Sequence, residues 1–446
     1  MLRQQPVALL AAPFWLLKGR AYLKHEIARR IEFDATLLPY RTELVDYLRA
    51  EHRRYRLIVL ATGADELLAR QVAGYLQLFD LVLASNGSTN LSGESKRARL
   101  VDEFGDKGFD YAGNESRDLA VWSSAKRGVV VDPKPGLLTA AARITQAKSA
   151  FVEPRASFRE YVSALRPQHW LKNILVFVPI VASHLFLEPV LWLRTFLAFM
   201  GFCCCASSGY LINDLCDLPA DRRHPHKRLR PFASGRLPLA YALVIAPALA
   251  VLGCVLAGML SSISLACLLF YFVMTLAYSL GLKRVALLDI VVLAGLYTLR
   301  IFAGGLAIGI WPSVWLVAFS IFLFISLGFV KRYAELVIMR SVDGDHAMAR
   351  SYELSDAELL AAKGTAAGYA AVVVLALYIA SGAAKVLYSR HQVMWCACPL
   401  LLYWVGYVWL IAHRGKMHHD PLVFALRDRT SRILILLMLA TFLLSI

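Results

Sequence analysis

The sequence predicts an all-α polytopic membrane bundle preceded by a small α/β domain. The first observation behind this prediction is composition: apolar residues make up 58% of the 446 residues and mean hydropathy is +0.54, both above the values of soluble domains. The second is distribution, because long apolar runs occur only after about residue 170. We therefore divide the chain into domains 1–150 and 151–446.

The N-terminal domain contains short apolar runs at 57–61, 81–85 and 128–132. Helical patterns lie between them, at 65–78 and 95–104. Short buried strands that alternate with helices are typical of a parallel α/β sheet. From Asp132-Pro133 onward the pattern breaks, and we expect a linker that runs to about residue 155.

The membrane domain contains about nine apolar segments long enough to cross a bilayer. Lys and Arg concentrate in four loops between these segments, at 214–236, 283–284, 331–363 and 414–432. Cytoplasmic loops of membrane proteins are enriched in Lys and Arg. We therefore expect a multi-pass protein of a bacterial-type inner (plasma) membrane, with these loops and the N-terminal domain in the cytoplasm. The centres of the segments lie near residues 179, 200, 248, 272, 298, 321, 376, 402 and 438.

The formal net charge of +16 does not indicate nucleic-acid binding. Basic cytoplasmic loops explain the charge, and no aromatic-and-basic recognition pattern accompanies it. The eight cysteines form no pair of C-x-x-C knuckles, so the sequence predicts no zinc site. The expected partners are the lipid bilayer and the substrates, and the oligomeric state is not predicted.

A carboxylate-rich segment directly follows the second apolar run. Asn213, Asp217 and Asp221 are four residues apart, so on one continuous helix they share a face, with Asp214 beside them. Carboxylates and an amide on one face repel unless a cation lies between them, and oxygen ligands suit Mg²⁺. The basic run that follows supplies positive charge for phosphate oxygens. The segment predicts a metal–diphosphate site, with Lys227 and Arg228 on the substrate.

A second group of polar residues begins at Tyr278 and continues through Lys283 and Arg284. The two basic residues also fit an ordinary topology signal. Asp289 lies at the start of a span, where it could complete a second set of metal ligands. Arg300 lies about three turns further in, where a charged side chain is costly and usually faces a polar cavity.

A third group precedes the first apolar segment and contains Arg166, Trp170, Lys172 and Asn173. These side chains either anchor the membrane interface or bind a lipid phosphate, and the sequence leaves both open. The last charged loop, with His418, His419 and Asp420, is expected to be a cap rather than a metal site.

These motifs resemble the UbiA superfamily of intramembrane prenyltransferases over residues 160–446. The resemblance implies nine helices around a central cavity, with two Asp-rich loops that hold Mg²⁺ and a diphosphate. Arg166-Pro167, Asp221-Arg222, His224-Pro225 and Leu282-Lys283-Arg284 are most similar to the decaprenyl-phosphate phosphoribosyltransferase branch. That branch takes phosphoribosyl diphosphate and a polyprenyl phosphate.

We therefore expect a Mg²⁺-dependent transferase that moves phosphoribosyl to a polyprenyl phosphate. The alternative is transfer of a polyprenyl group from its diphosphate to an aromatic acceptor such as 4-hydroxybenzoate. A non-enzymatic transporter or scaffold is disfavoured by the clustered metal ligands. The expected metal ligands are Asn213, Asp214, Asp217, Asp221 and Asp289. The expected catalytic residues are Asp214, Asp217, Asp221, Asp289 and Lys283. The expected substrate-binding residues are Arg166, Lys172, Asn173, Lys227, Arg228, Tyr278, Arg284 and Arg300.

Residues 57–132 resemble a haloacid-dehalogenase-like (HAD-like) phosphatase. Thr62 matches its second motif, Lys96 its third, and Gly113-Asn114 with Asp118 its fourth. No D-x-D pair precedes Thr62, although that family's nucleophile comes from such a pair. We expect this domain to be incomplete and non-catalytic, either because its first strand was lost or because the chain begins too late.

Overall fold

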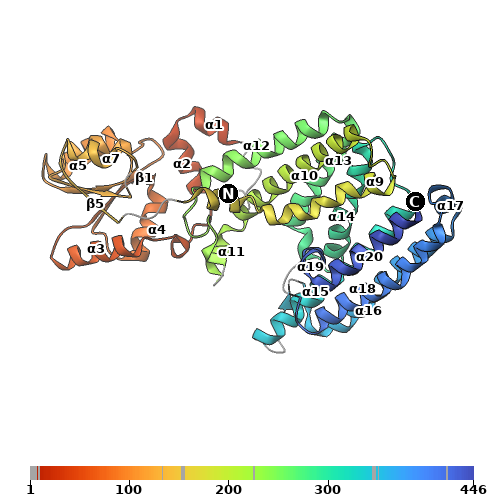
Figure 1. Cartoon of the computed structure of the whole chain (residues 1–446). Helices are drawn as coiled ribbons and strands as arrows, with labels where there is room; N and C mark the ends of the chain where they lie inside the picture. The colour runs from red at the N-terminus through yellow and green to blue at the C-terminus, as the bar shows by residue number, and fades with distance from the viewer. Residues whose placement is uncertain are drawn as a thin grey trace. The chain divides into compact units, whose positions relative to one another are not determined.

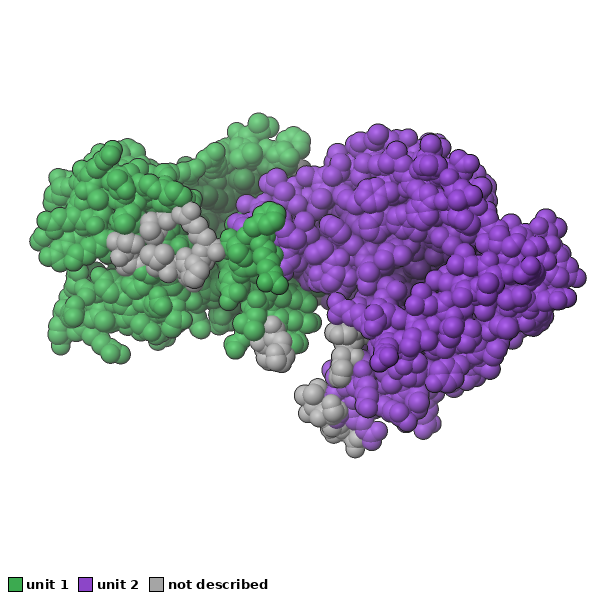
Figure 2. Space-filling view, viewed as in Figure 1, with its two compact units in different colours: residues 1–160, 216–238 green, residues 161–215, 239–446 purple. Residues whose placement is uncertain are grey.

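The computed structural model divides the chain into two compact units, coloured separately in Figure 2. Unit 1 comprises Met1–Glu160 and Cys216–Pro238, and unit 2 comprises Tyr161–Leu215 and Leu239–Ile446. The described residues are 8, 11–132, 134–151, 156–224, 227–343, 348–349, 351–417 and 420–446.

Unit 1 contains two sets of parallel strands. The strands β1 (Val59–Asp65) and β2 (Leu81–Ser85) pair with each other, and β3 (Asp110–Gly113), β4 (Arg127–Val131) and β5 (Gln146–Ala150) pair in that order. The parallel α/β prediction is confirmed. Its helices are α1 (Ala12–Leu17), α2 (Arg20–Ala28), η2 (Ala35–Leu37), α3 (Thr42–Arg53), α4 (Glu66–Leu76), α5 (Glu94–Phe104), η3 (Ser116–Asp118), α6 (Leu119–Trp122), α7 (Leu137–Ala142), α11 (Leu218–Arg223) and η5 (Lys227–Leu229).

The expected linker to residue 155 is wrong, because α7 and β5 occupy much of it. Among the described strands, β5 lies at the end of its sheet and pairs only with β4. A strand at a sheet edge needs no continuous apolar run, so its sequence lacks the signal that identified β2 and β4. The core beneath this sheet is built around Val121, Trp122 and Val130, all fully buried.

Unit 2 is a helical bundle (Figure 1). The helix α8 (Phe158–Ala164) begins in unit 1 and ends in unit 2. The other elements of unit 2 are η4 (Pro167–Phe177), α9 (Val178–Ala182), α10 (Pro189–Cys216), α12 (Leu239–Gly258), α13 (Ser262–Leu280), η6 (Leu282–Arg284), α14 (Leu288–Ala307), α15 (Val314–Asp343), β6 (Met348–Ala349), β7 (Tyr352–Glu353), η8 (Leu354–Asp356), α16 (Ala357–Ala380), α17 (Gly382–Leu387), η9 (His391–Cys396), α18 (Ala397–His413), α19 (Pro421–Arg427) and α20 (Arg429–Ser445).

Among the described residues, seven helical segments are long and apolar enough to cross a membrane. They coincide with seven of the nine predicted segments, but the count of nine is not confirmed. The first predicted segment forms η4 and the short helix α9, and the last forms α20, which has only 17 residues. The seven are Pro189–Cys216, Leu239–Gly258, Ser262–Leu280, Leu288–Ala307, Val314–Arg340, Leu354–Ala380 and His391–His413.

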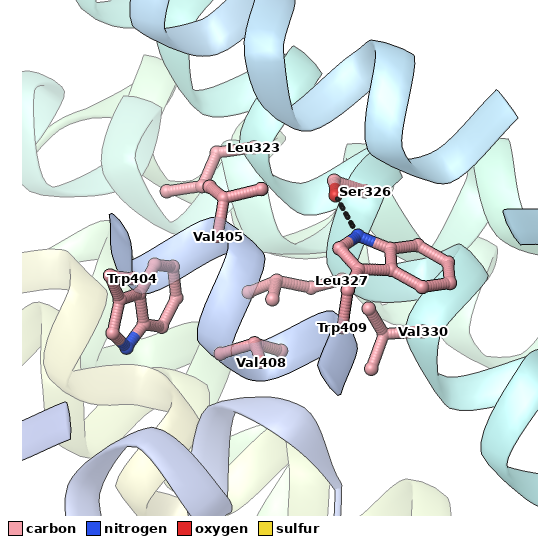
Figure 3. Close-up of a pocket in the computed structure, with 8 residues that line it drawn as sticks. All are labelled: Leu323, Ser326, Leu327, Val330, Trp404, Val405, Val408 and Trp409. Atoms are coloured by element: carbon pink, nitrogen blue, oxygen red, sulfur yellow. Dashed lines mark hydrogen bonds between the residues drawn. The ribbon is translucent and has the colours of Figure 1, made fainter. Parts of the chain in front are cut away.

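Small residues let α15, α16 and α18 approach closely. A Cβ added at Gly364 would lie 2.2 Å from Cζ2 of Trp409, and one at Gly368 would lie 2.6 Å from Cγ1 of Val405. The Ser326 hydroxyl donates to the Gly364 carbonyl at 2.7 Å and accepts from the Trp409 indole at 3.3 Å. Figure 3 shows this indole contact beside a small apolar pocket between α15 and α18. Small residues and interhelical hydrogen bonds of this kind hold membrane helices together.

The expected charged loop at 331–363 is partly wrong. The helix α15 continues through Lys331 and Arg332 to Asp343, and the side chain of Arg332 is fully buried. These charges remain inside the bundle because carboxylates of other segments pair with them.

Candidate active site

The sequence analysis placed the first motif on one continuous helix, but the structure breaks the motif into two helices. The helix α10 ends at Cys216, and Asp217 is the N-cap of α11. Pro219 causes the break, because it has no N–H to donate to Leu215 and its ring clashes with that carbonyl. Asn213 and Asp214 therefore end a long helix in unit 2, whereas Asp217 and Asp221 belong to unit 1.

Within unit 2, the three predicted groups converge at the end of α10. A guanidinium nitrogen of Arg166 lies 2.5 Å from a carboxylate oxygen of Asp214, and this guanidinium stacks 5.3 Å from the Tyr210 ring. The Lys283 ammonium lies 3.5 Å from the amide oxygen of Asn213. Acidic and basic groups from three distant segments thus meet at one end of the bundle.

Within unit 1, Asp221 is buried and pairs with Arg230 at 2.7 Å. Lys227 and Arg228 lie on η5 and are exposed. Exposed cations on a short turn are free to reorient toward a soluble anion. Their assignment to a substrate stays a prediction.

Asp289 is fully buried, and both of its oxygens have partners. Nε of Arg332 donates to Oδ2 at 2.5 Å, and the Tyr352 hydroxyl donates to Oδ1 at 2.6 Å. Arg332 also donates to Tyr278 at 2.8 Å and to Glu335 at 2.6 Å. This is the environment of a buried ion pair, and the role of Asp289 as a metal ligand stays a prediction. Arg284, nearby in sequence, is exposed.

Asp420, expected to lie in a cap, reaches into the bundle. Its Oδ2 accepts from Lys172 at 2.6 Å and from Lys331 at 3.2 Å, and Tyr297 donates to Oδ1 at 3.2 Å. Burial by itself raises the pKa of Asp420, but the two ammonium groups hold it well below its usual range. Sequence reasoning missed the roles of Lys331 and Asp420, for which the only signal was a charged residue at the edge of an apolar run. His418 and His419, which precede Asp420, lie outside the described residues.

Arg300 is buried, as expected of a charge that faces a polar interior. Its guanidinium donates to the Asn173 amide oxygen at 2.7 Å, to the Tyr271 hydroxyl at 2.8 Å and to the Leu296 carbonyl. The nearby His169 has a buried Nδ1 without a hydrogen-bond partner among the described residues. Burial, together with the charges of neighbouring basic groups, lowers the pKa of His169 to about 4, so its ring is neutral at neutral pH.

Among the described residues, no three His, Cys, Asp or Glu side chains are grouped closely enough to hold a metal by themselves. Mg²⁺ does not require such a cage, because one or two carboxylates and substrate phosphates suffice. Asn213 and Asp214 supply hard oxygen donors of the right kind. This donor chemistry fits Mg²⁺, provided that a phosphate contributes the remaining ligands.

The sequence profile of one family matches residues 176–428, more than half of the chain. The chain belongs to the UbiA prenyltransferase family. As a UbiA protein with seven apolar helices of spanning length in the part of the chain that the structure describes, it is an integral membrane transferase.

Relatives of this UbiA chain differ in how much of it they match. The uncharacterized protein y4nM of Sinorhizobium fredii is 34% identical over 95% of this chain and 82% of its own length. The decaprenyl-phosphate phosphoribosyltransferase of Mycobacterium tuberculosis is 32% identical over 63% of this chain and 92% of its own length. The solved structure of a UbiA homolog from Archaeoglobus fulgidus bound to GPP and Mg²⁺ is 18% identical, covers 63% of this chain and 99% of its own, and has a TM-score of 0.48.

The N-terminal unit of this UbiA chain buries Lys96 and Asp118, two of the residues singled out by sequence, whereas Thr62 is half-buried and Asn114 exposed. Lys96 donates to the Tyr111 hydroxyl at 2.9 Å and lies 3.8 Å from Asp118. Burial lowers the pKa of Lys96 and raises that of Tyr111. Asp118 also accepts from the backbone N–H of Asn114 at 3.0 Å. Neighbouring groups of unit 1 therefore provide partners for Lys96 and Asp118. The HAD-like identity of the domain stays a prediction.

Proposed function

We propose that this UbiA protein transfers phosphoribosyl from phosphoribosyl diphosphate to a polyprenyl phosphate. The observation that carries the proposal is 32% identity to decaprenyl-phosphate phosphoribosyltransferases over about nine-tenths of their length. The convergence of Arg166, Asp214 and Lys283 at the end of α10 supports it, because it joins oxygen donors to phosphate-binding cations.

In this proposal, the predicted ligands of the first motif, Asn213, Asp214, Asp217 and Asp221, would hold Mg²⁺, and Asp289 would contribute to a second set of ligands. When bound, Mg²⁺ supplies positive charge to the diphosphate oxygens.

The basic side chains of the chain itself stabilise the charge that develops on the leaving group. Lys283 lies beside Asn213, and Lys227, Arg228 and Arg284 are exposed side chains that the proposal assigns to diphosphate oxygens. As the bond between C1 of the ribose and the diphosphate breaks, positive charge develops on the ribosyl ring. An oxygen of the lipid phosphate then forms the new bond to C1.

Substitution of Asp217 tests the metal assignment. We expect Asp217→Ala to abolish turnover while membrane expression is unchanged, because a metal ligand is lost without a loss of core packing. The matched control is Asp106→Ala, which removes an exposed carboxylate of unit 1. Full activity of purified Asp217→Ala protein would contradict the assignment.

The donor is tested by two assays on the same preparation. One offers radiolabelled phosphoribosyl diphosphate with polyprenyl phosphate, and the other offers polyprenyl diphosphate with 4-hydroxybenzoate. We expect lipid-linked product in the first assay. Product only in the second would establish the alternative, aromatic prenylation.

A further inference from the structure

Cations outnumber carboxylates around Tyr297 among the described residues; Lys172 and Arg300 are buried, and Lys331 is half-buried. Lys172 and Arg300 flank its ring, at 5.6 Å and 5.5 Å from the ring centroid. Its hydroxyl donates to Asp420, which also binds Lys172 and Lys331. Three cations from η4, α14 and α15 thus gather around Tyr297. Asp420 contacts Lys172 and Lys331 but not Arg300, so one carboxylate faces three cations and leaves a formal excess of two positive charges.

No other described group cancels this excess. The hydrogen-bond partners of Arg300 are an amide oxygen, a phenol and a backbone carbonyl, and no described carboxylate lies within 4.0 Å of its guanidinium. His169, which faces the same group, is neutral at neutral pH. The nearby Asp214 is already paired with Arg166.

Excess charge of one sign is costly to bury unless an opposite charge accompanies it. A phosphate monoester carries up to two negative charges and accepts several charge-assisted hydrogen bonds from Lys and Arg. Its charge therefore matches the excess, whereas the proposed metal site at the end of α10 already serves the diphosphate.

The surroundings favour a phosphate attached to a hydrocarbon chain. A small hollow beside Lys331 and Asp420 is also lined by Leu293, Leu327 and Leu422. Apolar walls beside a basic group suit an amphiphile, whose head binds the cations while its tail follows the leucines.

We propose that Lys172, Lys331 and Arg300 form a largely buried anion site for the phosphate head group of a polyprenyl monophosphate, and that Asp420 occupies the lysines when the lipid is absent. The lipid phosphate takes over Lys172 and Lys331, and Asp420 moves aside. This inference rests on the proposed function only for the class of lipid, because the excess charge itself is independent of the donor.

The experiment measures binding of radiolabelled farnesyl phosphate to the full chain in nanodiscs, with EDTA and without phosphoribosyl diphosphate. We expect Lys331→Gln and Arg300→Gln to weaken binding at least tenfold. The matched control Lys385→Gln, on the exposed side of α17, should bind as the unmodified protein does. Asp420→Asn should bind several-fold more tightly, because a competing carboxylate has been removed.

Each outcome decides a part of the inference. Unchanged binding by folded Lys331→Gln protein overturns the site, and weaker binding by Asp420→Asn overturns the role of Asp420 as a competitor. If Lys331→Gln does not fold, Lys331→Arg and the isosteric Asp420→Asn decide instead: the first should retain binding and the second should improve it. Equal competition by inorganic phosphate and farnesyl phosphate would overturn the lipid assignment. Because neither donor nor metal is present, failure of the transferase proposal does not affect this readout.

Discussion

Replacement of Arg332 by Gln should strongly destabilise the membrane unit. The Arg332 and Asp289 side chains are 0% and 1% exposed, so the substitution leaves a buried carboxylate without its cation. Removal of one partner of a buried pair costs roughly 3–5 kcal/mol. At about 1.4 kcal/mol per factor of ten, the folding equilibrium constant should fall by about two to four orders of magnitude.

The assay is reversible unfolding by SDS in mixed micelles, followed by tryptophan fluorescence. Arg340→Gln, which removes an exposed cation from the same helix, is the matched control. The double variant Arg332→Gln/Asp289→Asn should recover at least about 1 kcal/mol relative to Arg332→Gln alone, because the stranded charge is gone. If Arg332→Gln is no less stable than Arg340→Gln, the ion-pair reasoning is refuted.

Three further predictions concern other parts of the chain. Gly364→Leu should reduce the yield of folded protein, because the larger side chain overpacks against Trp409. Gly382→Ala should not, because an added Cβ there meets nothing within 4 Å. The two yields are compared from the monodisperse peak in size-exclusion chromatography. Because the folded-state pKa of Asp420 is lowered, its contribution to stability is present above the unfolded value of about 3.9 and is lost as pH falls below it. Unfolding measured from pH 6 to pH 3 should show a steeper loss than in Asp420→Asn, and parallel curves would contradict the prediction. The full chain should hydrolyse p-nitrophenyl phosphate no faster than its Asp118→Ala variant, because no D-x-D pair precedes the second HAD-like motif; hydrolysis lost in that variant would contradict this.

Local patterns in the sequence were enough to predict most elements. The apolar run at 81–85 coincides with β2, and seven apolar segments coincide with helices of spanning length. Both signals arise within the element itself, since burial of a whole strand or span requires a continuous apolar stretch. The carboxylates of the first motif were also recognisable, because they lie close together in the chain. The break of the helix at Asp217 could have been predicted from Pro219.

The pairing of buried charges was decided only by tertiary structure. Lys172 and Asp420 are 248 residues apart, and Asp289 and Arg332 are 43 apart. In sequence, a Lys or Arg at the edge of an apolar run is typical of a cytoplasmic loop, and Lys331 and Arg332 were assigned to one for that reason. Whether such a charge lies in water or inside the bundle depends on a carboxylate supplied by a distant segment. The sequence by itself therefore determined the membrane class and the family motifs, whereas the fold determined which charges those motifs bury together.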